Sequence, residues 1–155
     1  MKIRSAFVRG VVSGFAGGVA WLIGVALFFG PAQGILGDPE RQSEKLIEAF
    51  TAAPAPRTVE APWILPVALL AIGGAWGCMY VWIRSAWPGP WWKRGLRFAL
   101  LGWVIMALWF EFYLLWNVLH EPTMLVALEL ACWAGVMSVV GLAIAGMEAA
   151  LRPAH

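Results

Sequence analysis

The amino-acid sequence predicts an all-α membrane protein: a four-transmembrane-helix bundle with a short amphipathic interfacial helix between spans 1 and 2. Hydrophobic residues make up 61% of the 155 positions and charged residues 13%, roughly half the charged share of soluble domains. The apolar residues fall into four long stretches, and most charged residues lie outside them. We therefore treat residues 1–155 as one integral membrane domain whose first partner is the lipid bilayer.

Each apolar stretch is close to the roughly 20 residues that a helix needs to cross about 30 Å of hydrocarbon. The predicted spans cover residues 10–29, 61–83, 98–119 and 123–147. They must be helical because lipid cannot satisfy free backbone N–H and C=O groups. The first apolar stretch is too long for a typical signal peptide and no clear cleavage site follows it, so we expect it to remain as an anchor.

Basic residues set the expected orientation. Most Lys and Arg residues flank one end of the spans, namely Lys2, Arg4, Arg9, Arg84, Lys93, Arg94, Arg97 and Arg152, whereas the other end has Arg41, Lys45 and Arg57. The positive-inside rule then places both termini in the cytoplasm, and we expect a bacterial inner membrane. A net charge of +2 divided in this way gives no basic surface for nucleic acid.

The segment between the first two spans carries a helix-start pattern. Asp38 is expected to act as N-cap, with Pro39 at the first helical position and Glu40 in the first turn. Leu46, Ile47 and Phe50 then share one face. We expect an amphipathic helix over residues 39–51, resting on the membrane surface as a connector or acting as a lid or docking element.

Small residues recur at four-residue spacing in span 1, at Gly10, Gly14 and Gly18. Small residues allow helix backbones to approach closely in lipid, where packing drives association. Part of this pattern is needed to close the bundle. Because the ridge exceeds what one internal contact requires, we expect it also to face another subunit, either a different membrane protein or a second copy of this chain.

Three carboxylates lie within the apolar stretches. We expect Glu148, at the end of span 4, to reach water or Arg152, and we assign it no function. Glu111 and Glu129 each lie nine residues from His120, which marks the tight turn between spans 3 and 4. Both should therefore sit at the same depth, about 10 Å below the outer surface by helix-rise arithmetic.

Asn117, His120 and Glu121 extend this polar set toward the outer surface, so that with Glu111 and Glu129 they would form a funnel. A lipid-facing carboxylate costs several kcal/mol, and two adjacent carboxylates would share a proton. Three interpretations are open. The acids could form a structural pair, satisfied in the bundle or by a partner; a proton or cation site of a transporter; or, with His120, a metal site.

The sequence does not contain the residues that several kinds of cofactor or catalytic site require. The chain has two His, too few to place axial haem ligands on facing helices, and no di-iron Glu-x-x-His repeat. Cys78 and Cys132 do not form a C-x-x-C pair. No catalytic motif is present, and the sequence indicates no particular cofactor and no metal site. The leading hypothesis is a non-catalytic subunit or assembly factor of a membrane complex. The alternative is a small proton-coupled transporter or channel-like oligomer that uses Glu111 and Glu129.

Overall fold

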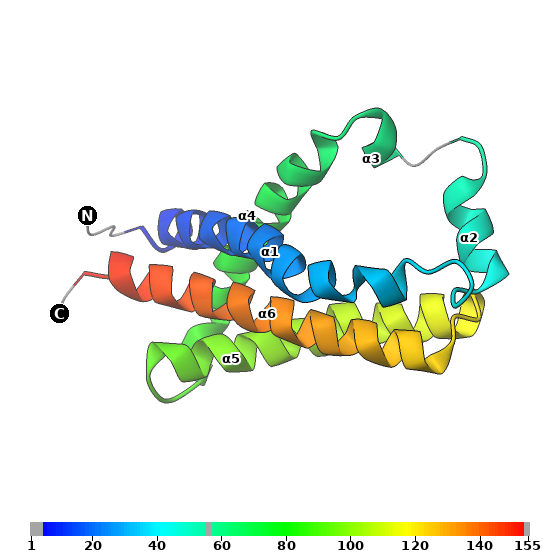
Figure 1. Cartoon of the computed structure of the whole chain (residues 1–155). Coiled ribbons are helices and arrows are strands. Elements are labelled where there is room, and N and C mark those ends of the chain that lie inside the picture. The colour runs from blue at the N-terminus through cyan, green and yellow to red at the C-terminus, as the bar shows by residue number, and fades with distance from the viewer. Residues whose placement is uncertain (1–4, 55–56, 154–155) are drawn as a thin grey trace.

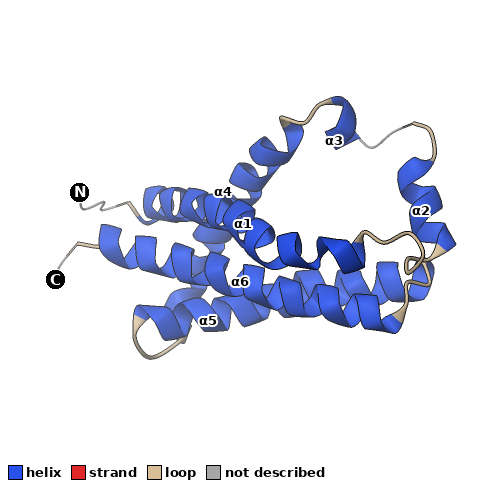
Figure 2. Ribbon diagram, in the orientation of Figure 1, coloured by secondary structure: helices blue, strands red, loops and turns tan. Residues whose placement is uncertain are grey.

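The computed structural model describes residues 5–54 and 57–153, and every regular element in these ranges is helical (Figures 1 and 2). Four helices are long and apolar enough to span a membrane, which confirms the predicted fold class. They are α1 (Ala6–Leu36), α4 (Ile64–Ile83, extended by η1, Arg84–Ala86), α5 (Trp91–Gly102, continued by the π-helical segments η2, Trp103–Leu108, and η3, Glu111–Val118) and α6 (Thr123–Leu151). The shorter α2 (Glu44–Thr51) and α3 (Arg57–Glu60) lie between α1 and α4.

Three of the long helices, α1, the helix begun by α5, and α6, extend beyond the predicted spans, whereas α4 begins three residues inside its span, at Ile64. α1 continues through Pro31 to Leu36, because a membrane bundle can compensate the hydrogen bond that proline removes. The helix begun by α5 starts at Trp91, among basic residues that lie outside an apolar stretch. Lys2 and Arg4 of the predicted basic flank fall outside the described residues.

The start of the connector helix was predicted wrongly. Asp38 does not cap a helix; its carboxylate accepts the backbone N–H of Glu40 at 3.0 Å and the Nε of Arg41 at 2.9 Å, which makes a local turn. Ser43 is the N-cap instead and accepts the N–H of Leu46 at 3.2 Å. Both Asp and Ser can satisfy free N–H groups at a helix start, and the Asp38 side chain is used before the helix begins.

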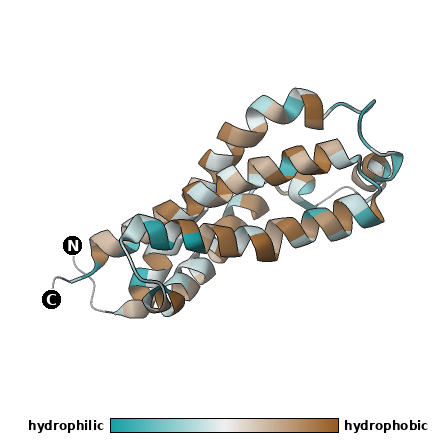
Figure 3. Ribbon diagram, turned by 90° about the horizontal axis from the view of Figure 1, so that it is seen from below, coloured by the Kyte–Doolittle hydropathy of each residue, from teal (hydrophilic) through white to brown (hydrophobic). Residues whose placement is uncertain are grey.

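We call the end of the bundle where α1 begins and α6 ends the terminal end, and the end near α2 the connector end. The start of α1 and the end of α6 lie on the same side of the molecule (Figure 1). Figure 3 shows hydrophobic residues dominating the long helices, with hydrophilic residues frequent in the connector and near the terminal end. α1 packs against both α4 and α6, and α5 packs against α6.

Glycines bring α1 and α4 into backbone contact. A Cβ atom added to Gly14 would overlap the carbonyl oxygen of Gly73, and one added to Gly77 would overlap the carbonyl oxygen of Gly10. An adjacent face of α1 uses Gly17 against Ile144 of α6. α1 is thus the central helix, with small residues on two neighbouring faces that each admit another helix.

Away from this crossing, α4 separates from the rest of the bundle. Figure 1 shows its connector-end half running away from α1 toward α3. Leu65 and Val67 in this half are 49% and 54% exposed, whereas Gly73 and Gly77 at the crossing are buried. The bundle is therefore closed toward the terminal end and open along one side of the connector end.

The crossing predicts a strong position dependence for glycine substitution. Gly14→Ala should lower the free energy of unfolding by about 1–3 kcal/mol, because neither backbone can yield to the new methyl group. Thermal unfolding in detergent would measure the loss. Gly30→Ala is the matched control, since a Cβ there meets nothing within 4 Å. Equal stabilities of the two variants would contradict the contact.

Candidate functional site

A cavity of about 520 Å³ lies at the connector end, bounded by α1, α2, η3 and α6. Most of its surface is apolar and aromatic; the lining includes Phe29, Phe50, Phe110, Leu115 and Trp133. Two acidic side chains, Glu111 and Glu129, also line it. A few polar groups in a largely apolar cavity of this size are typical of a site for a small molecule.

The two acids lie side by side in the structure. Glu111 is 1% exposed; Glu129 lines the same cavity and is close enough for its charge to act on the Glu111 carboxyl. Trp133 donates its indole N–H to Glu111 Oε1 at 2.7 Å. Glu129 and Trp133 are four residues apart on α6, so one helix face supplies both neighbours of Glu111.

The hydrogen bonding of the second carboxylate oxygen of Glu111 indicates that the acid pair needs a proton. Oε2 is buried and accepts no N–H or O–H group from the part of the chain that the structure describes. Two ionised carboxylates would repel each other, whereas a carboxyl that carries a proton becomes a hydrogen-bond donor. One proton held between Glu111 and Glu129 would satisfy both side chains.

Glu111 begins a π-helical segment, η3, and a second π-helical segment, η2, precedes it. A π-helix is wider than an α-helix and often occurs at functional sites. It also changes which residues share a face, so α-helical spacing cannot predict the neighbours of Glu111. The sequence gives no clear signal for this change, since the segment contains no proline or glycine between Trp103 and Val118.

Asn117 and His120 do not line this cavity. They border a separate hollow of about 410 Å³ beside the hairpin turn, together with Pro122 and Thr123. His120 has a φ of 59°, a left-handed conformation in which histidine is enriched and which helps the chain reverse direction. The structure therefore does not join Asn117 and His120 to the acid pair as one funnel.

Glu121, which was expected at the rim of that funnel, borders the same hollow as Asn117 and His120. It is 3% exposed, and its Oε2 accepts the backbone N–H of Ser43 at 3.0 Å. Because Ser43 caps α2, Glu121 attaches the connector helix to the turn between η3 and α6. Within residues 5–54 and 57–153, no three His, Cys, Asp or Glu side chains are grouped to hold a metal ion.

The expected partner surface at Gly10, Gly14 and Gly18 is occupied by α4. All three glycines are buried, and a Cβ at Gly18 would lie 2.9 Å from the carbonyl oxygen of Leu69. Another subunit could reach this ridge only by displacing α4. All three glycines of the ridge meet α4, whereas the contact of α1 with α6 uses Gly17 and Gly24.

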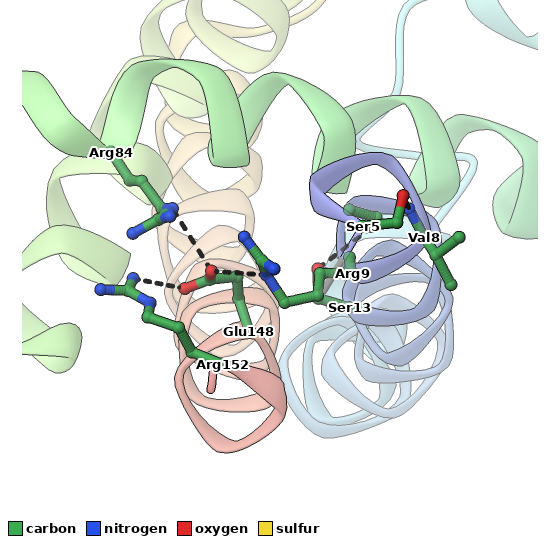
Figure 4. A network of polar contacts seen from close by, with 8 residues as sticks. Ser5, Val8, Arg9, Ser13, Arg84, Glu148 and Arg152 are labelled. Carbon is green, nitrogen blue, oxygen red and sulfur yellow. Dashed lines mark hydrogen bonds and ion pairs between the residues drawn. The ribbon is translucent and has the colours of Figure 1, made fainter. Parts of the chain in front are cut away.

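The sequence analysis missed a buried ionic cluster at the terminal end. Glu148 is fully buried; its Oε1 lies 3.4 Å from Arg9 Nε and 3.3 Å from Arg84 Nε, and its Oε2 lies 2.7 Å from Arg152 Nη2. Figure 4 shows the three arginines converging on this carboxylate from α1, η1 and the end of α6. Glu148 was expected to reach water or Arg152, and it binds Arg152; its contacts with Arg9 and Arg84 were not predicted.

The position of Arg9 contained a usable signal. Arg9, Ser13 and Gly17 recur at four-residue spacing, and Gly17 packs against Ile144, which lies four residues before Glu148. The face of α1 that contacts α6 therefore ends in a cation opposite an anion. Ser13 supports this turn by donating its hydroxyl to the carbonyl of Arg9 at 2.7 Å.

Comparison with protein-family models, curated proteins and solved structures finds no match to this chain.

Glu148 should be the most costly acid to remove. Glu148→Ala would leave three closely spaced arginines without their shared anion, and breaking a buried ion pair in this way costs about 3–5 kcal/mol. Asp38→Asn is the control; it removes an exposed pair with Arg41 and should cost less than about 1 kcal/mol. Thermal unfolding in detergent at constant salt would compare them. A Glu148→Ala protein as stable as the control would show that the cluster contributes little.

Proposed function

We propose that the protein is a small proton-coupled membrane transporter in which Glu111 and Glu129 hold the coupling proton. The observation that carries this proposal is the adjacent acid pair on the wall of the 520 Å³ cavity. Ionisable residues inside a membrane are costly, and they commonly mark ion or proton pathways. A purely structural pair would have no need of a cavity beside it.

The chemistry of the lining favours an organic cation with an apolar body as the substrate. Phe29, Phe50 and Phe110 supply aromatic surface, and cations are attracted to aromatic faces. The carboxyl pair supplies negative charge once its proton leaves. A cation that binds between these groups would release the shared proton to water, and a returning proton would release the cation.

Trp133 is a positioning residue in this scheme. Its indole N–H fixes Oε1 of Glu111, which leaves the buried Oε2 available for a proton shared with Glu129. The indole donates its hydrogen bond whether or not the acid is ionised. It therefore holds the pair together through both halves of the exchange.

The proposed topology places both termini in the cytoplasm of a bacterial inner membrane. Arg84, Arg94 and Arg152 lie at the terminal end, which agrees with the positive-inside rule. The acid pair then lies in the half of the membrane that faces away from the cytoplasm. Protons and cations would reach it from the periplasmic side.

Proton release provides a direct test. Addition of tetraphenylphosphonium to the weakly buffered, detergent-purified protein should release up to one proton per chain, measured with a pH indicator. Glu111→Gln and Glu129→Gln should abolish this release and reduce uptake driven by a pH gradient in proteoliposomes to the level of protein-free vesicles. Their unfolding temperatures should stay near that of the unmodified protein, since Gln can preserve a hydrogen bond.

Glu48→Gln is the matched control, because Glu48 is an exposed acid on α2. It should retain both proton release and uptake. Unchanged release in the Glu111→Gln and Glu129→Gln proteins, or equal loss in the control, would refute the assignment of the coupling proton to this pair.

A second candidate function is that of an accessory subunit or assembly factor, and the open side of α4 supports it. Trp63, Leu65 and Val67 are all exposed on the half of α4 that leaves the bundle. Lipid could cover this apolar surface, but a transmembrane helix of another protein or of a second copy would pack there equally well.

A photo-cross-linking residue at position 67 would test this candidate. In native membranes, the substitution of Val67 should yield a defined adduct with one other polypeptide or with a second copy. Substitution of Ile105, which is 63% exposed on η2, is the control for random collisions. Adducts with lipid alone at position 67, or the same adducts at position 105, would contradict the subunit function.

A further inference from the structure

The arginines at the terminal end outnumber the acids beside them. Arg84 and Arg152 share the one carboxylate of Glu148, and Arg94 lines a hollow with Arg152 and Glu148, so these four side chains have a net charge of +2 when ionised. The Arg9 and Arg84 side chains are only 9% and 18% exposed. Partly buried charge of one sign is unfavourable unless an anion balances it.

A hollow of about 240 Å³ lies directly beside this cluster. Its lining includes Arg94, Arg152 and Glu148, with Tyr80 and Trp91. Arg152 uses Nη2 to bind Glu148 at 2.7 Å, while its enclosed Nε makes no hydrogen bond to any described residue. The Nε of Arg94 is held by the carbonyl of Gly89 at 2.8 Å, which orients that guanidinium.

The position of the hollow relative to the membrane identifies the source of the anion. Trp82, Trp91 and Trp92 are all exposed near this end of the chain's second and third spans, and tryptophans concentrate at the level of lipid headgroups. Basic pockets between transmembrane helices on the cytoplasmic side bind anionic headgroups. The planar guanidinium matches phosphate oxygens with paired N–H donors.

We infer that the hollow formed by Tyr80, Trp91, Arg94, Glu148 and Arg152 is a binding site for the phosphate group of an anionic phospholipid. Arg94 and Arg152 contact the phosphate. Glu148 binds no lipid; its Oε2, 2.7 Å from Arg152 Nη2, holds the Arg152 guanidinium at the hollow. Trp91 packs beside the glycerol portion at the interface.

The test uses the full-length protein in neutral detergent. Native mass spectrometry would compare binding of phosphatidylglycerol with that of phosphatidylcholine, and thermal unfolding would be measured with each lipid. Phosphatidylglycerol should bind preferentially and raise the unfolding temperature. Arg94→Ala should weaken its binding about tenfold or more, as expected for loss of a charge-assisted hydrogen bond, while Arg94→Lys should restore part of it.

Lys93→Ala is the matched control, because Lys93 carries the same charge beside Arg94 but does not line the hollow; its nitrogen lies over the Trp92 ring at 5.2 Å. It should weaken binding less than about fivefold, the effect of general attraction to an anionic surface.

Without lipid, the Arg94→Ala protein should unfold at the same temperature as the unmodified protein. Equal affinity for the two lipids, or equal losses in Arg94→Ala and Lys93→Ala, would overturn the inference. An excess of inorganic phosphate that reproduces the full stabilisation would assign the site to a soluble anion and overturn the lipid assignment.

Discussion

The close approach of α1 to two neighbours is the constraint on which the remaining structure depends. In lipid no hydrophobic force drives helices together, so association requires well-packed surfaces. Gly14 admits the backbone of α4, and Gly17 admits Ile144 of α6. The same helix therefore makes both contacts. Because the glycines of α1 set how closely α6 approaches, they also place Arg9 opposite Glu148.

The number and nature of the spans could be predicted from composition, because lipid leaves an apolar segment few conformations. The ends of the helices could not be predicted from the sequence. A helix can include Trp91 or continue through Pro31 when the bundle provides partners for the backbone N–H and C=O groups. The common depth of Glu111 and Glu129 follows from their distances to His120. Their contact does not, because it depends on the rotation of two helices and on a π-helical segment that no local pattern announces.

The surroundings of polar residues were harder to predict than those of apolar ones, because they depend on partners that are distant in the sequence. Glu121 and Glu148 both lie near a predicted membrane surface, where solvation is the natural expectation, yet both are buried. One accepts the backbone N–H of Ser43, and the other binds three arginines. Each partner is distant in the sequence except Arg152, so spacing within one helix identified that pair alone.

The Glu148 cluster holds three helices together at the terminal end. It ties α1, the end of α4 and the end of α6 at one point, whereas α4 diverges freely at the opposite end. The glycine crossing, from Gly10 at Cys78 to Gly18 at Leu69, is the second attachment of α4. The first residues of α4, next to α3, therefore lie outside both attachments.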